Sequence, residues 1–265
     1  ANPNGDGSGL VNFIATANNA IGYRFNFGDN TGDILASGGL NSHRFNKAGL
    51  NSYNVTLIAT GKGGISSSKT VTIEVFSDFN PVEIKNNITG GLSSSKSWFW
   101  DAARPAHLGV GPLDTVDPSF YAAAPFEKES VGCLYEDEII FSQDENEIVT
   151  VELINLGNTY FHRLEVEDEL GVPNPGEDTC YEYGTSGNNV VNFAPSTSEI
   201  DETLSTQVSF VIQNGFMSYF LGNNDYEILF ISDSEMHVRI IQTEPSGFQL
   251  AWYQWFTTNP STGGG

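Results

Sequence analysis

The sequence predicts an all-β protein with two β-sandwich modules, and three observations favour this fold class. Apolar and polar residues alternate over segments such as 53–60 and 70–76, which is the pattern of half-buried strands. Clusters of Gly, Asn, Asp and Ser separate these segments, for example at 28–32 and 61–68. Helical periodicity is almost absent, and the 12% aromatic content is too high for a disordered acidic chain.

Charge divides the chain near residue 78. Residues 1–78 contain five Lys or Arg and five Asp or Glu, which leaves 6 of the 11 basic and 28 of the 33 acidic residues for 79–265. The second part therefore carries the whole net charge of -22, and we place a linker at 77–81, ending at Pro81. Such acidity disfavours nucleic acids, anionic membranes and sulfated glycans, because these partners need Lys and Arg. Neutral ligands and divalent cations stay open.

The first module has a compact aromatic pattern. Aromatic residues alternate in the segment 23–27 and precede a Gly28-Asp29-Asn30 turn; a His-Arg-Phe strand follows at 43–45, then Ala48-Gly49 and a Tyr-Asn-Val-Thr-Leu strand at 53–57. These motifs resemble the PKD (polycystic-kidney-disease) domain, although Asn30 stands where that family usually has Gly. The resemblance implies an Ig-like spacer domain over residues 8–77.

The second module, residues 84–258, has strand-like segments joined by polar loops, which favours a jelly roll. These segments are 96–100, 138–141, 148–155, 190–193, 206–212, 226–232, 235–243 and 249–256. A barrel with a small-ligand cavity is the alternative, which the long connections 101–132 and 156–189 disfavour. Cys133 and Cys180 either form a disulfide across this module or remain two buried thiols.

Aromatic residues in the second module predict a carbohydrate site. Sugars in water bind flat apolar ring faces and polar groups that reach their hydroxyls. We predict stacking by Trp98, Trp100, Phe120, Tyr121 and Trp252, and hydrogen bonding by Arg104, His107 and Lys128. For any single tryptophan, core packing is the competing interpretation. For the loop from residue 101 to 128, the competing interpretation is a packed segment that covers a sheet edge.

A second resemblance rests on the runs 95–101, 107–112, 118–128 and 132–138. They are similar to the C-terminal domain of PKD-containing surface glycan-binding proteins of Bacteroidota polysaccharide-utilisation systems. The resemblance implies a lipid-anchored protein on the extracellular face of the outer membrane. Such a protein captures a neutral polysaccharide, often a β-glucan such as laminarin, for other outer-membrane proteins to take up. We expect a monomer without catalytic activity.

Two other functions compete with glycan capture. A glycoside hydrolase of the laminarinase type would use Glu165, Glu167 and Glu169 as alternate carboxylates on one strand, whereas solvated surface carboxylates are the simpler interpretation. A protein–protein adhesion module would need an exposed apolar patch. No cofactor is required. The acidic runs at 144–147, 165–169 and 177–178 would allow a structural Ca²⁺ whose ligands the sequence does not identify.

Overall fold

The computed structural model describes residues 7–29, 31–45, 47, 49–185 and 187–260. The chain divides into two compact units, Ala1–Asn80 and Pro81–Gly265, so the boundary lies inside the predicted linker. Strands dominate both units, and the all-β prediction is confirmed. Asn30 and Ala48, which belong to the predicted first-module motif, lie outside the described residues. None of the described helices is both long enough and apolar enough to cross a bilayer.

The N-terminal unit contains a four-stranded sheet, in the order β3-β2-β5-β6, and a strand pair β1-β4. Its strands are β1 (Leu10–Ile14), β2 (Ala20–Asn26), β3 (Asp33–Leu35), β4 (Leu40–Arg44), β5 (Gly49–Gly61) and β6 (Ser66–Ser77), with 3₁₀ turns at Ser37–Gly39 and Lys62–Gly64. The predicted alternation buries Phe25 and Phe27 against Phe45 and Tyr53. Gly28 is required at the turn, because its φ is 72° and a Cβ there would lie 2.7 Å from the Asn54 carbonyl oxygen.

The C-terminal unit is built around a closed barrel. The strands of the barrel are β7 (Ser94–Trp100), β10 (Glu138–Gln143), β11 (Val149–Ile154), β14 (Asn189–Pro195), β15 (Val208–Ile212), β16 (Asp225–Ile231), β17 (Glu235–Thr243) and β18 (Gln249–Thr257). Each pairs antiparallel with the next along the chain, and β18 returns to β7 where Phe256 faces Trp100. Within the described residues these strands thus form an up-and-down barrel, the alternative to the jelly roll.

The two long connections explain why the sequence favoured a jelly roll. A jelly roll needs connections that cross between two sheets, and long loops suggest such crossings. Here, in the part of the chain that the structure describes, neither long connection crosses between sheets: the first adds two short strands beside β18, and the second forms a separate strand pair. The first forms β8 (Leu108–Gly111), β9 (Tyr121–Ala122) and a 3₁₀ turn at Glu129–Val131, and the second forms the pair β12 (Asn158–Phe161) and β13 (Thr179–Glu182) with α2 (Val166–Leu170) between them.

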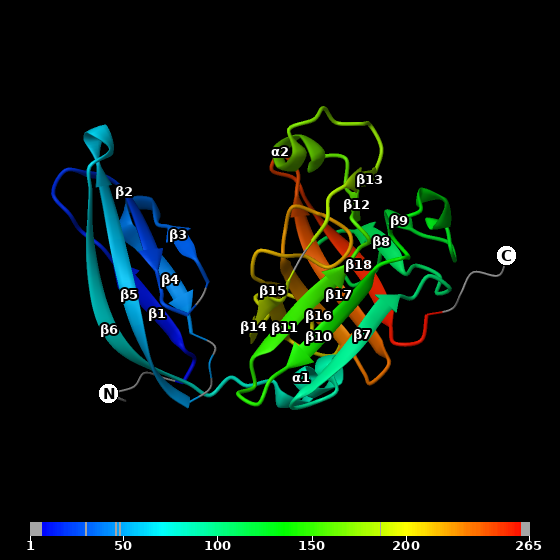
Figure 1. The fold of residues 1–265 in the computed structure, drawn as a ribbon, viewed down its shortest axis with the longest axis horizontal. Coiled ribbons are helices and arrows are strands. Elements are labelled where there is room, and N and C mark those ends of the chain that lie inside the picture. The colour runs from blue at the N-terminus through cyan, green and yellow to red at the C-terminus, as the bar shows by residue number, and fades with distance from the viewer. Residues whose placement is uncertain (1–6, 30, 46, 48, 186, 261–265) are drawn as a thin grey trace. The chain divides into compact units, whose positions relative to one another are not determined.

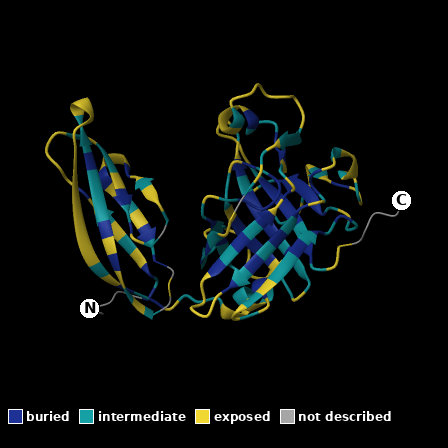
Figure 2. Ribbon diagram, in the orientation of Figure 1, coloured by how far each residue is buried: buried dark blue, intermediate teal, exposed yellow. Residues whose placement is uncertain are grey.

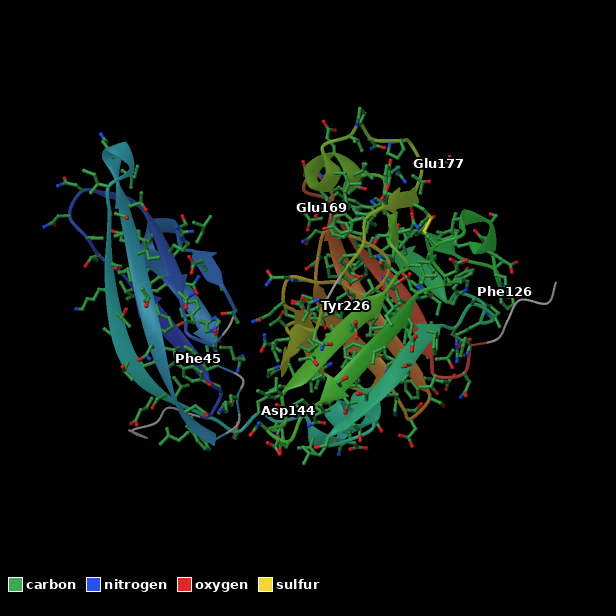
Figure 3. The ribbon with its side chains drawn as sticks, in the orientation of Figure 1. Phe45, Phe126, Asp144, Glu169, Glu177 and Tyr226 are labelled. Atoms are coloured by element: carbon green, nitrogen blue, oxygen red, sulfur yellow. A yellow bond between two sulfur atoms is a disulfide. The ribbon has the colours of Figure 1, made fainter. Side chains whose placement is uncertain are left out.

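Large side chains fill the barrel interior. Inward positions of β7, β10, β15 and β16 hold Trp98, Phe141, Phe210 and Tyr226, all fully buried. Figure 2 shows buried residues along the barrel strands, and Figure 3 labels Tyr226. The helix α1 (Val82–Thr89) lies at one end of the barrel, while α2 and the β12–β13 pair lie at the other (Figure 1). The sequence did not predict α1, which begins directly after Pro81.

Cys133 and Cys180 form a disulfide, so the first of the two alternatives for these residues is confirmed. The bond joins the β9–β10 connection to β13 and closes a sequence separation of 47 residues. Replacing both cysteines by serine should therefore lower the free energy of unfolding by about 2–4 kcal/mol, because the unfolded chain gains conformational entropy. Urea unfolding followed by tryptophan fluorescence measures this, since all four tryptophans lie in the C-terminal unit. Wild type kept in reductant should match the variant, and unchanged stability would contradict the estimate.

Candidate ligand-binding site

The three tryptophans predicted to stack on a sugar lie inside the barrel. The exposed fractions of Trp98, Trp100 and Trp252 are 0%, 2% and 6%. Each indole nitrogen donates within the protein: Trp98 to the Ile88 carbonyl at 2.8 Å, Trp100 to the Ser218 hydroxyl at 2.7 Å and Trp252 to the Gln242 side chain at 2.8 Å. Their predicted stacking role is corrected to core packing. The physical reason is that the sheet closes into a barrel. Every second residue of a barrel strand points into the interior, and large side chains such as these fill that interior.

The predicted hydrogen-bonding residues Arg104 and His107 also have partners within the protein. The Arg104 guanidinium lies 4.1 Å from the ring centre of Trp255 and pairs with Asp101 at 2.6 Å and with Glu235. His107 is fully buried; its ring contacts the Arg104 carbonyl oxygen at 2.9 Å. Burial lowers the pKa of His107 and favours the neutral ring. His107 is therefore enclosed by the protein, whereas the Arg104 side chain stays 31% exposed, and its predicted role in binding stays a prediction.

Phe120, Tyr121 and Lys128 lie on the first long connection. The Tyr121 hydroxyl donates to Glu127 at 2.5 Å, and the Lys128 ammonium lies 5.1 Å from the Tyr121 ring centre. Burial, followed by the hydrogen bond to Glu127, raises the pKa of Tyr121. Phe120 is 61% exposed. The buried tryptophans do not share a surface with these three residues, whose predicted role in binding stays a prediction.

The three carboxylates of the hydrolase alternative do not share one strand face. Residues 166–170 form α2, and residues two apart on a helix point to different sides. Glu165 accepts a hydrogen bond from the Gln242 amide at 2.6 Å, and burial raises the pKa of Glu165. Glu169 accepts from the Tyr183 hydroxyl at 2.6 Å. The strand expected here is therefore corrected to a short helix.

A pocket of about 540 Å³ opens at the barrel end opposite α1, where β11 and β14 separate after Val151 pairs with Asn189. We call it the mouth pocket. Its walls come from these two strands, from α2 and the segment after β13, and from the β15–β16 connection; Glu169 of α2 is labelled in Figure 3. The lining residues are Val151, Leu153, Glu169, Tyr183, Gly184, Thr185, Asn189, Asn214, Gly215, Phe216, Phe220, Gly222, Asn223 and Asn224.

Three aromatic rings form the apolar part of the mouth pocket. The Phe216 and Phe220 ring centres are 5.0 Å apart in an edge arrangement, and Tyr183 lies 6.3 Å from Phe216 and 6.1 Å from Phe220. Phe161 stacks on Phe220 at 4.6 Å from outside the lining. These contacts fix the rings before any ligand arrives, which limits the entropy that binding would cost.

Neutral amides form the polar part. Within the described residues, the side-chain amides of Asn189 and Asn214 make no hydrogen bond to the protein, so they are available to a ligand. The amides of Asn223 and Asn224 instead donate to the Ile241 and Ile212 carbonyl oxygens, at 2.7 and 2.8 Å.

Glycine and tyrosine complete the geometry of the mouth pocket. A Cβ on Gly215 would lie 2.7 Å from the Asn189 side-chain nitrogen, so glycine lets that amide approach the backbone. The hydrogen bond to Glu169 and, secondarily, burial raise the pKa of Tyr183 to about 12, so its hydroxyl stays a donor at neutral pH. The described lining of the pocket therefore offers fixed rings, free amides and a single carboxylate.

The described residues contain no group of three or more His, Cys, Asp or Glu side chains placed to hold a metal ion. Carboxylates of the predicted calcium runs accept hydrogen bonds from the protein itself. Asp144 accepts from the backbone of Asn146 and Ile148, at 2.9 and 2.8 Å. Asp178 accepts from the Arg163 backbone at 3.0 Å and from the Tyr219 hydroxyl at 2.7 Å. We assign no calcium ligands.

The mouth pocket was absent from the sequence prediction, because its residues come from two strands and three connections that only barrel closure brings together. The available signal was the pairing of Asn and Gly with aromatic residues, as in Asn214-Gly215-Phe216 and Phe220-Leu-Gly-Asn223, which also marks ordinary turns. The chain matches neither a protein-family model nor a curated protein in sequence.

Proposed function

We propose that the C-terminal unit binds a neutral carbohydrate in the mouth pocket without cleaving it. The lining of this pocket carries the proposal: the half-buried rings of Tyr183 and Phe220, backed by the buried Phe216, stand beside free amides. The described lining holds one carboxylate and no Lys, Arg or His. Pyranose rings present apolar C–H faces and uncharged hydroxyls, which aromatic rings and amides complement. The volume of about 540 Å³ lies in the usual range for small-molecule sites.

The carboxylate content of the mouth pocket favours binding over hydrolysis. Glycoside hydrolases generally need two carboxyl groups that flank the scissile bond. Glu169 is the one carboxylate of the described lining, and its Oε1 accepts the Tyr183 hydroxyl. Capture without cleavage is therefore the activity that these groups favour.

The two family resemblances extend the proposal to a biological setting. A PKD-like spacer followed by a glycan-binding unit suits a lipid-anchored capture protein on the outer-membrane surface. Its first ligand candidate is a β-glucan such as laminarin, delivered to other outer-membrane uptake proteins. The pocket lining supports a neutral sugar of this kind, and the net charge of -22 disfavours anionic polysaccharides.

Removing a free amide from the pocket should weaken glycan binding. Asn214 has a φ of 53°, so Asn214→Gly deletes the carboxamide while the backbone conformation stays favourable. One lost hydrogen bond should reduce affinity roughly tenfold, or about 1.4 kcal/mol. The measurement is isothermal titration of the full chain with laminarin, mixed-linkage and β-1,4-glucans and mannan, followed by an assay for new reducing ends.

Asn19→Gly is the matched control, because Asn19 lies in the N-terminal unit and also has a left-handed φ, of 62°. It should leave affinity unchanged. Absence of heat with every glycan would reject carbohydrate binding, and release of reducing ends that Glu169→Gln abolishes would replace capture by hydrolysis.

A further inference from the structure

A second depression lies on the outer wall of the barrel, next to the mouth pocket. It has a volume of about 460 Å³, and we call it the wall groove. Its floor is the outer face of β15, β16 and β17, and its sides are the 113–114 and 196–199 segments. The lining residues are Leu113, Asp114, Ser196, Thr197, Ser198, Glu199, Ser209, Asn223, Asp225, Glu227, Arg239, Ile241, Thr243 and Gln249.

Asn223 lines both the mouth pocket and the wall groove. Its side chain is fixed from two sides: the amide nitrogen donates to the Ile241 carbonyl of β17, and the oxygen accepts from the backbone nitrogens of Asn224 and Asp225, at 2.8 and 3.2 Å. The two depressions are thus neighbours that share one pinned side chain as their common border.

We propose that the mouth pocket and the wall groove form one continuous surface for a linear oligosaccharide that crosses Asn223. This inference rests on the proposed function, and it adds that the protein binds an extended chain rather than a single sugar. Each depression alone falls in the volume range of small-molecule sites, so together they accommodate a longer ligand than either one. The Ser209 hydroxyl continues along the groove, and the Gln249 amide, which donates to the Thr243 hydroxyl at 3.1 Å, lies at its edge on β18.

The charge of the wall groove narrows the class of oligosaccharide. Glu227 and Arg239 neutralise each other, with Oε2 and Nε 3.1 Å apart. The carboxylates of Asp114, Glu199 and Asp225 remain, and the described lining offers no second basic residue against them. Uronate or sulfate groups would meet like charge there, so the ligand is an uncharged chain.

A length series tests this inference. We would titrate the full chain with laminari-, cello- and manno-oligosaccharides from disaccharide to hexasaccharide, and with alginate oligosaccharides of the same lengths. The hexasaccharide of the preferred series should bind at least about tenfold more tightly than its disaccharide. Alginate should bind much more weakly at every length.

Thr243→Tyr should remove the rise in affinity with chain length and leave the affinity for the disaccharide unchanged. The reason is that Thr243 is exposed and lines the wall groove but not the mouth pocket. Tyrosine is well accepted on strands. Thr70→Tyr, at an exposed strand position of the N-terminal unit, is the matched control and should change nothing.

Affinity that does not rise with length would overturn the continuous surface and leave the mouth-pocket proposal standing. The same holds if Thr243→Tyr weakens the disaccharide as much as the hexasaccharide. Alginate that binds as well as the neutral series would overturn the uncharged class. No binding at any length in any series would reject the proposed function itself, and this inference with it.

Discussion

Asp137→Asn should make the C-terminal unit more stable at pH 8 than the wild type, by up to about 4 kcal/mol, with little difference near pH 4. Asp137 is 1% exposed, and neither of its carboxylate oxygens makes a hydrogen bond of regular geometry within the described structure. Burial raises the pKa of Asp137 from 3.8 to about 7, with a small addition from Glu136, while the nearby Ser218 hydroxyl opposes the rise.

The sign of the pH dependence follows from proton binding. Between pH 3.8 and about 7 the folded state keeps a proton on Asp137 that the unfolded chain has lost. The free energy of unfolding therefore falls as pH rises through this window and stays low above it. Asparagine has no proton to lose, so the advantage of the variant grows over the same interval.

Urea unfolding at several pH values, followed by tryptophan fluorescence, measures this advantage. Asp233→Asn is the control, because it removes the same formal charge from a side chain that is 94% exposed. An advantage that stays constant from pH 4 to pH 8, or one that Asp233→Asn reproduces, would show that Asp137 does not titrate as a buried acid.

Local patterns predicted the strands and much of the core. The alternation that buries Phe25 and Phe27 follows from the period of a strand, and so does the shared face of Trp98 and Trp100. What alternation could not reveal is which face is the interior. That depends on closure between β18 and β7, at Phe256 and Trp100, two positions 156 residues apart in the chain.

The candidate site could not be predicted for a related reason. Its free amides lie at the start of β14 and just after β15, and its rings lie further along the β15–β16 connection and in the β13–β14 connection. Each of these stretches looks like an ordinary polar turn by itself. The acidic run at 165–169 shows the opposite difficulty, because alternate glutamates suggest a strand, whereas α2 forms and Glu165 is held by Gln242.

Arg239→Met is the second change with a large expected effect. The side chains of Arg239 and Glu227 are 5% and 6% exposed, and they pair across β16 and β17. Arg239 also donates to the Leu113 carbonyl oxygen at 2.7 Å, which ties the 112–117 segment to the barrel wall. Methionine leaves the Glu227 charge buried without a counter-ion, so we expect a loss of about 3–5 kcal/mol in the free energy of unfolding.

A second substitution separates the unpaired charge from lost packing. Glu227 Oε1 accepts hydrogen bonds from the Ser198 and Ser205 hydroxyls, both at 2.7 Å. Glutamine keeps an oxygen for both hydroxyls and removes the charge. The pair Glu227→Gln with Arg239→Met should therefore recover most of the stability that Arg239→Met loses, as measured by urea unfolding of all three variants. If the double variant is no more stable than Arg239→Met, the unpaired charge of Glu227 is not the cause of the loss. The loss then comes from the missing contact of Arg239 with the 112–117 segment.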